Sequence, residues 1–352
     1  MRVWLDALTS KQALIMNHLE RKLMKEGHEA IITCRNYDYV VSLLKLKGSR
    51  PVVYGGYGET LEDKIRAGLE RERFFVDLWE VRGRPDVHVS LTSPEAIRVA
   101  FRLKVPVIAL SDSPHSIYVN KLTMPLADVV ITPKCTPKEA YAYAVRPERI
   151  VQFDGLFEVM WIKGASYSPY DVRDLGLEPF SYIVLRPEEK KASYYPGGYE
   201  QPTKIGKLVK AVIEETELKV VVFPRYRDQG EYLRRLSGRR VLIPPRAVNT
   251  IPLLKYAVMV ITGGGTMATE AALLGTPAIT FFPRKLDVMR YLEGKGFPLI
   301  HIAGLEDVLK EALRIMRDHE AYRMDTESML KEVEEPTDLI IEHIEELGGI
   351  RS

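Results

Sequence analysis

The sequence lacks the features that mark a metalloprotein, a disulfide-bonded protein or a membrane protein. Only two of its 352 residues are cysteines, and Cys34 and Cys135 do not have the spacing of metal ligands. The seven histidines form no H-x-x-x-H or similar cluster. No stretch reaches the ~20 apolar residues of a membrane span, and the first residues, MRVWLDALTS, contain no signal-peptide core. We therefore expect free thiols, no metal site and a cytoplasmic location, with peripheral contact to a membrane left open.

An excess of one charge is also missing. Lys and Arg number 50, Asp and Glu number 48, and the formal net charge is +2. A protein that binds nucleic acid through bulk electrostatics carries a larger positive excess, so we expect no nucleic-acid partner. Asn and Gln together number eight, a scarcity that hints at a thermophilic source.

What the chain does contain is an alternation of apolar, strand-like runs with amphipathic helices. An apolar content of 46% and a charged content of 28% are ordinary for soluble domains, and the length suits two of them. Strand–helix alternation predicts right-handed crossovers and parallel sheets. The expected strands are Val3–Asp6, Ala30–Thr33, Val87–Leu91, Val105–Leu110, Asp128–Thr132 and Ile150–Phe153 in the first half, and Tyr182–Leu185, Val220–Phe223, Val241–Ile243, Val258–Thr262, Ala278–Phe282 and Leu299–Ile302 in the second.

The stretch Trp161–Tyr170 (WIKGASYSPY) interrupts this alternation and is typical of a linker. We therefore expect an N-terminal domain at residues 1–163 and a C-terminal domain at residues 164–335. A last helix within residues 336–352 would pack back toward the N-terminal domain. The expected fold class is α/β, with two Rossmann-like, doubly wound domains whose parallel sheets face each other across a cleft, a common place for a ligand.

The most informative segment is Gly263–Pro277 (GGGTMATEAALLGTP), which follows the apolar run Tyr256–Thr262 (YAVMVIT). A buried strand, a glycine turn and a helix N-terminus in this order form an anion cradle. Glycines let the backbone come close to a phosphate, and the first N–H groups of the helix point at it. The spacing matches neither the G-x-G-x-x-G fingerprint nor a P-loop. A purely structural turn therefore stands beside the phosphate interpretation.

The same segment supplies most of the candidate donor-binding residues. Glu270, one turn into the helix, would accept hydrogen bonds from a ribose diol, and its alternative is a solvated carboxylate. The expected diphosphate ligands are the backbone N–H groups and hydroxyl of Gly263, Gly264, Gly265 and Thr266.

Two arginines could complete this site, because each follows an apolar strand. Arg186 follows YIVL and Arg225 follows VVVFP, so both lie where ligands bind in open parallel sheets. A guanidinium there would clamp a diphosphate and stabilise the charge of a leaving nucleotide. Ser193, on the loop after Arg186, would cover the phosphates. The alternative is ordinary surface arginines.

The segment Gly263–Pro277 resembles the donor-binding segment of GT-B glycosyltransferases. General analogues are the N-acetylglucosaminyltransferase that makes lipid II and the non-hydrolysing UDP-N-acetylglucosamine 2-epimerases. Over nearly its whole length, the chain resembles a prokaryotic, mainly archaeal family of unknown function that is similar to the GT-B enzymes in fold. The stretches that carry this resemblance are SDSPHSIYVNKLTMPLADVVITP (111–133), FDGLFEVMWIK (153–163), LRPEEKKASYY (185–195) and FPRYRD (223–228).

The resemblance implies a GT-B-like pair of Rossmann-like domains, a nucleotide sugar held mostly by the second, an acceptor facing the first, and a homodimer as in the epimerases. The first strand-to-helix loop, DALTSKQAL (6–14), departs from the relatives. The G-T-R-P-E signature of the epimerases is absent, and no histidine stands near Lys11 or Gln12, where many relatives have one. This departure argues against a catalytic role for the loop, and Ser10 is most simply the N-cap of the next helix.

The candidate catalytic residues lie in the first domain. Asp112 and His115 follow the apolar run VPVIAL, and a histidine beside a carboxylate could deprotonate an acceptor hydroxyl. The alternative is a loop held by Asp and Pro turn chemistry. Glu158, in GLFE at the domain junction, could be the base, an acceptor ligand or a hinge contact.

We therefore expect an enzyme, namely a metal-independent glycosyltransferase that uses a nucleotide-diphosphate sugar, with UDP as the expected nucleotide. The nucleotide sugar enters as substrate, and no further cofactor is expected. The acceptor is unknown, and a lipid-linked or protein-linked glycan is one option. A nucleotide-sugar 2-epimerase or hydrolase is an alternative, and a non-catalytic binding or assembly protein on the same scaffold is another.

Overall fold

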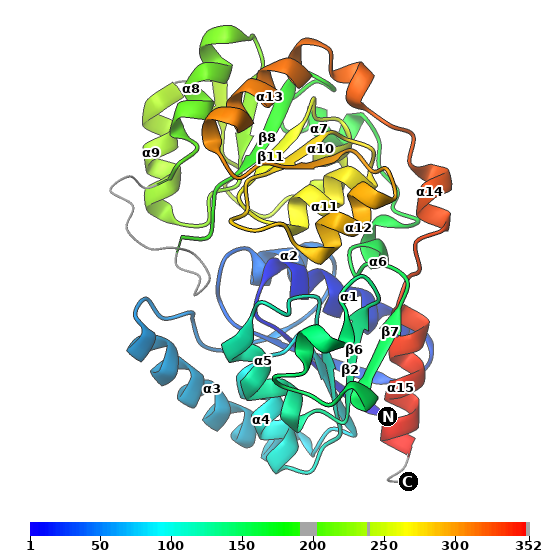
Figure 1. The fold of residues 1–352 in the computed structure, drawn as a ribbon. Coiled ribbons are helices and arrows are strands. Elements are labelled where there is room, and N and C mark those ends of the chain that lie inside the picture. The colour runs from blue at the N-terminus through cyan, green and yellow to red at the C-terminus, as the bar shows by residue number, and fades with distance from the viewer. Residues whose placement is uncertain (191–202, 238–239, 350–352) are drawn as a thin grey trace. The chain divides into compact units, whose positions relative to one another are not determined.

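A computed structural model of the chain describes residues 1–190, 203–237 and 240–349, which form two compact units (Figure 1). Unit 1 consists of Met1–Trp161 and Val333–Ser352, and unit 2 consists of Ile162–Glu332. The chain therefore passes from one unit to the other twice.

Unit 1 is built on a seven-stranded sheet whose described pairings are all parallel. The strand order is β3-β2-β1-β4-β5-β6-β7, so the direction of winding reverses between β1 and β4. In such sheets, ligands bind beyond the carboxyl ends of the strands at this reversal. The strands are β1 (Arg2–Ala7), β2 (Glu29–Cys34), β3 (Val52–Val53), β4 (Val87–Ser90), β5 (Val107–Leu110), β6 (Val129–Pro133) and β7 (Ile150–Phe153).

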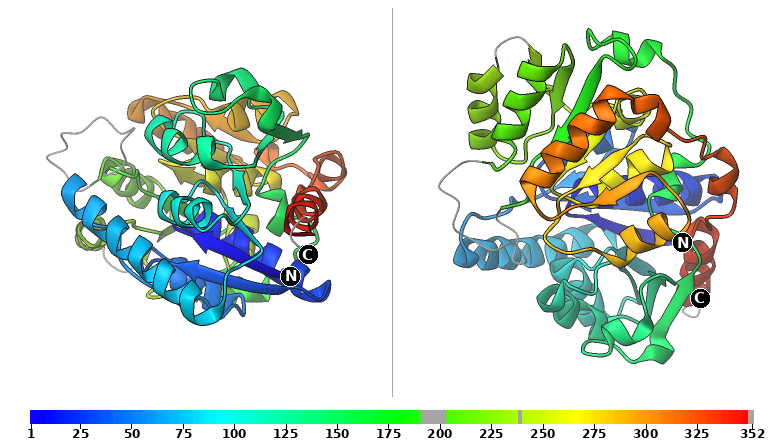
Figure 2. Two further views of the ribbon diagram at one scale, coloured as in Figure 1. Left: turned by 90° about the horizontal axis from the view of Figure 1, so that it is seen from below. Right: turned by 45° about the horizontal axis from the view of Figure 1, so that its top comes forward.

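Helices cover both faces of this sheet. Helices α1 and α2 pack on one face, and α3, α4 and α5 lie side by side on the other (Figures 1 and 2). The last helix, α15, also belongs to unit 1. The bounds are α1 (Ser10–Lys25), α2 (Val40–Leu46), α3 (Leu61–Arg82), α4 (Pro94–Arg102), α5 (Ile117–Thr123), α6 (Val159–Ile162, at the boundary) and α15 (Thr337–Gly349), with 3-10 turns η1 (Met124–Leu126), η2 (Lys138–Tyr141) and η3 (Pro147–Arg149).

Trp4 is the centre of the core beneath α3 and α4. Its ring lies 4.9 Å from Phe75, 5.1 Å from Trp79 and 4.4 Å from His88, measured between centroids. Its indole N–H donates to Thr33 Oγ1 at 2.8 Å, so the buried polar atom is satisfied. These contacts fix α3 against β1 and β4, the two strands at which the winding reverses.

Unit 2 repeats the plan with six strands, again with parallel pairings throughout its described residues. The order β10-β9-β8-β11-β12-β13 places the reversal between β8 and β11. Helices α8 and α13 share one core with β8, β9 and β11. The strands are β8 (Tyr182–Arg186), β9 (Lys219–Val222), β10 (Val241–Leu242), β11 (Val260–Thr262), β12 (Ala278–Thr280) and β13 (Leu299–His301). The helices are α7 (Tyr170–Arg173), α8 (Gly206–Glu215), α9 (Arg227–Ser237), α10 (Thr250–Lys255), α11 (Thr266–Leu273), α12 (Asp287–Gly294), α13 (Leu305–Arg317) and α14 (Glu327–Lys331), with the 3-10 turn η5 (His319–Tyr322).

The prediction of two parallel-sheet, Rossmann-like α/β domains is confirmed. Each expected strand is present with ends that shift by a few residues, whereas β3 was not expected because two residues carry no periodic signal. One local prediction is wrong: Thr9 is the N-cap of α1 and accepts from the Gln12 N–H, while Ser10 Oγ donates to Asp38 at 2.8 Å. Within the described residues, no helix has the length and apolar character needed to span a membrane.

Candidate functional site

In unit 2, a glycine turn joins β11 to α11 at the point where the winding reverses. The Gly263 N–H donates to the Arg186 carbonyl at 3.0 Å, and the Gly264 N–H donates to Thr262 Oγ1 at 3.0 Å. Gly265 is the N-cap of α11. The turn is thus held against the end of β8, and the next N–H groups are those of the first turn of α11, which helix geometry leaves without intrahelical acceptors.

A close backbone contact requires glycine at the first position of this turn. A β-carbon on Gly263 would lie 2.6 Å from Glu188 Cα. A β-carbon on Gly264 would lie 2.9 Å from Nη2 of Arg225, so this guanidinium lies directly over the turn. At Gly265 the nearest atom would be 3.5 Å away, an ordinary contact. Only the first glycine is therefore dictated by backbone packing, and the second lies beneath a cation.

Both candidate arginines reach this turn from the carboxyl ends of adjacent strands. Arg186 is the last residue of β8, is buried, and is in register with Thr262. Arg225 follows β9, and its Nε donates to the Pro187 carbonyl at 3.2 Å. Its Nη1 lies 3.5 Å from a carboxylate oxygen of Glu189. The structure therefore brings the two arginines and the glycines together around one turn, an arrangement suited to a polyanion.

The remaining donor-side candidates lie on α11, except for one. Thr266 is the first residue of the helix and is half-buried. Glu270 lies one turn later and is only 4% exposed, so it is not a solvated surface carboxylate. Ser193 lies outside the described residues.

Glu188 is a buried carboxylate of this turn that the sequence did not single out. It is fully buried and accepts from Thr203 Oγ1 at 2.9 Å and from the Lys204 N–H at 2.8 Å. Its carbonyl accepts from Gln229 Nε2 at 3.2 Å. These bonds connect the loop after β8 to the residues before α8 and to α9. They therefore hold the backbone of Glu188 in the position where Gly263 packs against it.

In unit 1, Lys11 joins two carboxylates from distant parts of the chain. Its Nζ donates to a carboxylate oxygen of Asp112, after β5, and to Glu158 Oε1 at 2.6 Å, just before α6. The side chains of Lys11, Asp112 and Glu158 are 13%, 8% and 3% exposed. We refer to these three residues as the lysine triad. The second oxygen of Glu158, Oε2, is buried and has no hydrogen-bond partner among the described residues.

The triad separates the proton affinities of its two carboxylates. Burial raises the pKa of Glu158, and the repulsion from Asp112 adds to this effect, while Lys11 opposes it. Burial acts on Asp112 in the same direction, but the attraction of Lys11 and its hydrogen bond outweigh burial and lower the pKa of Asp112. Two carboxylates with pKa values displaced in opposite directions are the usual basis of acid and base roles in one site.

His115 lies on the same loop as Asp112, and its charge also lowers the pKa of that carboxylate. Asn120 of α5 stabilises this loop, because its Nδ2 donates to the Ser113 carbonyl at 3.0 Å and to the hydroxyl of Tyr143 at 2.7 Å. The structure therefore brings Asp112, His115 and Glu158 into one electrostatic group. Lys11, which connects them, was missed because the departure of the first loop from its relatives argued against a role.

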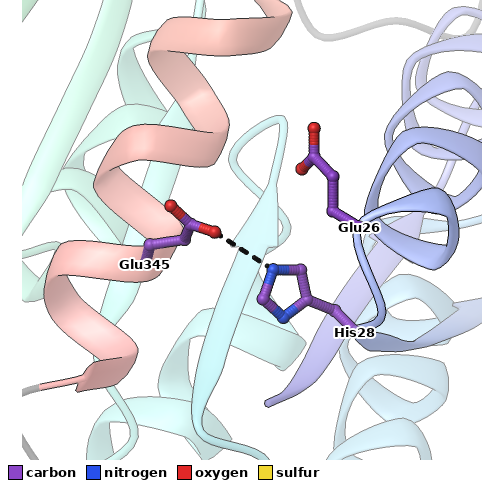
Figure 3. Close-up of side chains that lie close together, drawn as sticks. All are labelled: Glu26, His28 and Glu345. Carbon is purple, nitrogen blue, oxygen red and sulfur yellow. Dashed lines mark hydrogen bonds and ion pairs between the residues drawn. The ribbon is translucent and has the colours of Figure 1, made fainter.

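One group of three potential metal ligands occurs in the described part of the chain. Glu26, His28 and Glu345 each place one ligand atom within 4.8 Å of the others (Figure 3). His28 Nε2 lies 3.2 Å from Glu345 Oε1, and Glu26 forms an ion pair with Lys22 at 3.2 Å. Since the Lys22 ammonium competes for Glu26, we interpret the group as a contact of His28 with Glu345 of α15 beside an ion pair at the end of α1. The expectation of no metal site stays a prediction.

The fold is similar to solved structures of UDP-GlcNAc 2-epimerases. One, from Neisseria meningitidis and bound to UDP-GlcNAc, gives a TM-score of 0.71 at 13% identity, with 98% of this chain and 99% of that chain covered. Another, from Methanocaldococcus jannaschii in complex with UDP-GlcNAc and UDP, gives 0.67 at 18% identity, with 90% and 93% covered. The likeness establishes the class of fold, two Rossmann-like parallel-sheet domains of the GT-B type.

Within that class, the chain belongs to the family described as "Protein of unknown function (DUF354)", whose model matches residues 1–348. An uncharacterised protein of Methanocaldococcus jannaschii, MJ0665, is 30% identical over 349 residues, which is 97% of each chain. The resemblance to a family of unknown function with a GT-B-like fold is thus confirmed.

Proposed function

We propose that the protein is a glycosyltransferase that uses a nucleotide-diphosphate sugar, with UDP as the nucleotide. The observation that carries the proposal is the turn at Gly263–Gly265, where glycine backbone, a helix N-terminus and the guanidinium of Arg225 converge at the sheet reversal of unit 2. The solved structures of similar fold that bind UDP-GlcNAc support this assignment of the nucleotide.

In this mechanism, a base takes the proton of the acceptor hydroxyl, and the candidate for that base in unit 1 is the carboxylate of Glu158. A raised pKa makes Glu158 a better base than an ordinary carboxylate, and its buried Oε2 has no hydrogen-bond partner among the described residues. The acceptor oxygen then bonds to the anomeric carbon, and the bond from that carbon to the diphosphate breaks. The electron pair leaves with the diphosphate, whose charge is stabilised by the N–H groups of α11 and by Arg186. Lys11 fixes the position of the base.

A nucleotide-sugar 2-epimerase or hydrolase is the second candidate, and the lysine triad favours it. Epimerisation needs an acid and a base around one sugar, and Asp112 and Glu158 have displaced pKa values of the appropriate kind. Incubation of UDP-GlcNAc with the enzyme alone in D2O separates the two reactions. Deuterium at C2 of a recovered nucleotide sugar supports the epimerase, whereas slow release of free sugar without deuteration does not.

A thermal-shift panel of UDP-, GDP-, dTDP- and CMP-sugars tests the nucleotide site. A ligand at about 100 times its Kd adds about 2.7 kcal/mol to the free energy of unfolding, so a binding nucleotide raises Tm clearly. We expect UDP-sugars to stabilise the wild type and a Glu215→Gln control, an exposed glutamate of α8. The Glu270→Gln variant should respond weakly. If no nucleotide raises Tm, the protein is instead a non-catalytic scaffold or uses a different substrate.

A further inference from the structure

Unit 1 contains a second glycine-rich loop, Tyr54–Thr60 (YGGYGET), between β3 and α3. Gly55 and Gly58 both have φ of +75°, and a β-carbon on Gly58 would lie 2.6 Å from the Asp63 carbonyl carbon. The loop continues the pairing of β2 with β3. The Tyr54 N–H donates to the Cys34 carbonyl and the Asn36 N–H donates to the Gly55 carbonyl, each at 2.9 Å. It is therefore a built structure at the carboxyl edge of the unit 1 sheet.

The N-terminus of α3 does not supply an anion site here. Thr60 and Asp63 form a capping box, in which the Thr60 hydroxyl oxygen accepts from the Asp63 N–H at 3.1 Å and the Asp63 carboxylate accepts from the Thr60 N–H at 3.3 Å. The carboxylate of Asp63 thus occupies the position that a ligand anion would take.

The cation at this loop is Arg35, the residue that follows β2. Its guanidinium lies 5.0 Å from the ring centroid of Tyr37 and 4.7 Å from that of Tyr57, and the two rings stack at 4.3 Å. The Nε of Arg35 donates to the Leu8 carbonyl at 3.0 Å. No carboxylate in the described part of the chain forms an ion pair with this guanidinium. Its two terminal nitrogens can therefore bind an external acceptor bidentately.

The electrostatic surroundings of Arg35 lack a dedicated counter-ion. Burial lowers the pKa of Arg35 and the nearby Arg71 adds to this, while Glu95 opposes it. Glu95 is already bound by Arg71 at 3.2 Å. A second cation, the Lys64 ammonium, lies 4.6 Å from the centroid of Tyr57. Arg35 itself suits a phosphate, because the oxygens of a phosphate match the planar fork of a guanidinium.

This cation also contacts the loop before α1, the helix that carries Lys11. Arg35 holds the Leu8 carbonyl, and Ser10, just before Lys11, donates to Asp38 at 2.8 Å. The segment after β2 is thus bonded twice to the first strand-to-helix loop. An anion on Arg35 would therefore lie at the same edge of unit 1 as Lys11.

We propose that Arg35, flanked by Tyr37 and Tyr57, forms a binding site for a phosphate group in unit 1. That this phosphate belongs to the acceptor rests on the proposed function. The acceptor is then a phosphorylated compound, either a soluble phosphate ester or a phospholipid headgroup. The tyrosine rings provide an apolar surface beside the charge, on which a sugar ring or a glycerol backbone can lie.

The test is a calorimetric titration of the full chain with inorganic phosphate, with and without saturating UDP to fill the unit 2 site. We expect Arg35→Met to weaken the phosphate binding that UDP does not affect by about tenfold or more. Arg35→Lys should weaken it less, because lysine keeps the positive charge but lacks the two parallel N–H donors of the guanidinium. Arg173→Met is the matched control, because Arg173 also stacks on a tyrosine, Tyr170, but is paired with Glu178 at 2.9 Å. Its phosphate binding should equal that of the wild type.

Two further probes identify the source of the phosphate. Binding of glycerol 3-phosphate that depends on Arg35 supports a soluble ester, and Arg35-dependent recruitment to phosphatidylcholine vesicles containing phosphatidic acid supports a headgroup. Unchanged phosphate binding in folded Arg35→Met and Arg35→Lys variants would overturn the proposal. Phosphate binding that depends on Arg35 while no nucleotide binds would preserve the site and refute the proposed transferase.

Discussion

Lys11 Nζ donates to Glu158 Oε1 at 2.6 Å although 147 positions separate the two residues in the chain. Lys11 lies in the first turn of α1 and Glu158 directly precedes α6. This ion pair and the one to Asp112 hold three segments of unit 1 together: the start of α1, the loop after β5 and the residue before α6. Removing any one charge therefore changes the proton affinity of the other two.

Lys11→Met should strongly destabilise unit 1, because it leaves two buried carboxylates without a cation. Breaking a buried ion pair in this way typically costs about 3–5 kcal/mol. Chemical denaturation with urea measures the loss, and Lys22→Met, which removes the surface ion pairs of Lys22 with Glu26 and Asp338, is the control. The double variant Lys11→Met/Glu158→Gln should recover part of the loss. A Lys11→Met protein as stable as the wild type would show that the triad is not formed.

Glu158 should give unit 1 a stability component that declines as pH rises. The unfolded carboxyl loses its proton near its ordinary pKa of 4.5, whereas the raised pKa keeps the folded group protonated to higher pH. In the window between these two pKa values the folded state binds more protons, so its free energy of unfolding falls with increasing pH. Urea unfolding of wild type and Glu158→Gln across this window measures the component by difference. Identical pH profiles for the two proteins would contradict it.

His88 should produce a slope of the opposite sign, between about pH 4 and pH 6.5. Burial lowers the pKa of His88 from 6.5 to about 4. Between these values the unfolded state binds the extra proton, so stability falls as pH drops, by about 3 kcal/mol in total. His88→Phe keeps an aromatic ring beside Trp4 and should flatten this part of the profile, as followed by tryptophan fluorescence during unfolding. A His88→Phe profile with the same slope as the wild type would contradict this prediction.

The glycine turn offers a comparison of neighbouring alanine substitutions. Gly263→Ala places a β-carbon against the Glu188 backbone and should lower the free energy of unfolding by about 1–3 kcal/mol, with loss of nucleotide binding. Gly265→Ala meets only an ordinary contact and should resemble the wild type in both measurements. Equal behaviour of the two variants would mean that the turn does not pack as described.

Arg225→Leu should weaken UDP binding about tenfold or more, because it removes the guanidinium that covers Gly264. Arg227→Leu is the matched control, since Arg227 is 92% exposed and pairs only with Glu231 on its own helix among the described residues. Calorimetric titration with UDP measures both affinities. An unchanged affinity in Arg225→Leu would remove this arginine from the proposed site.

The architecture could be read from the sequence because the strands are apolar runs separated by helices with clear start and stop signals. Gly263 and Arg186 could be placed at one site for the same reason, since each directly follows such a run, and parallel strands bring their carboxyl ends to one edge. That argument places both residues at the same edge of the sheet, and the structure shows that their strands β8 and β11 are neighbours.

The lysine triad could not be predicted in the same way. Whether Lys11 meets Asp112 depends on the order β1-β4-β5, which no local pattern encodes. The loop around Arg35 was missed for a different reason. YGGYGET is a glycine-rich turn between a strand and a helix, but β3 is too short for its apolar residues to mark a strand. A search for glycine turns that did not require a strong preceding strand would have found it.

The double passage of the chain has a consequence for synthesis and for dissection of the protein. Gly155 pairs with Glu334 so closely that a β-carbon at Gly155 would overlap the Glu334 carbonyl, which places the returning segment against β7. Unit 2 is continuous and emerges whole from the ribosome before unit 1 has received its last helix. Residues 162–332 can therefore be expressed as one uninterrupted fragment, whereas unit 1 requires residues 1–161 to be spliced to Val333 and the helix that follows.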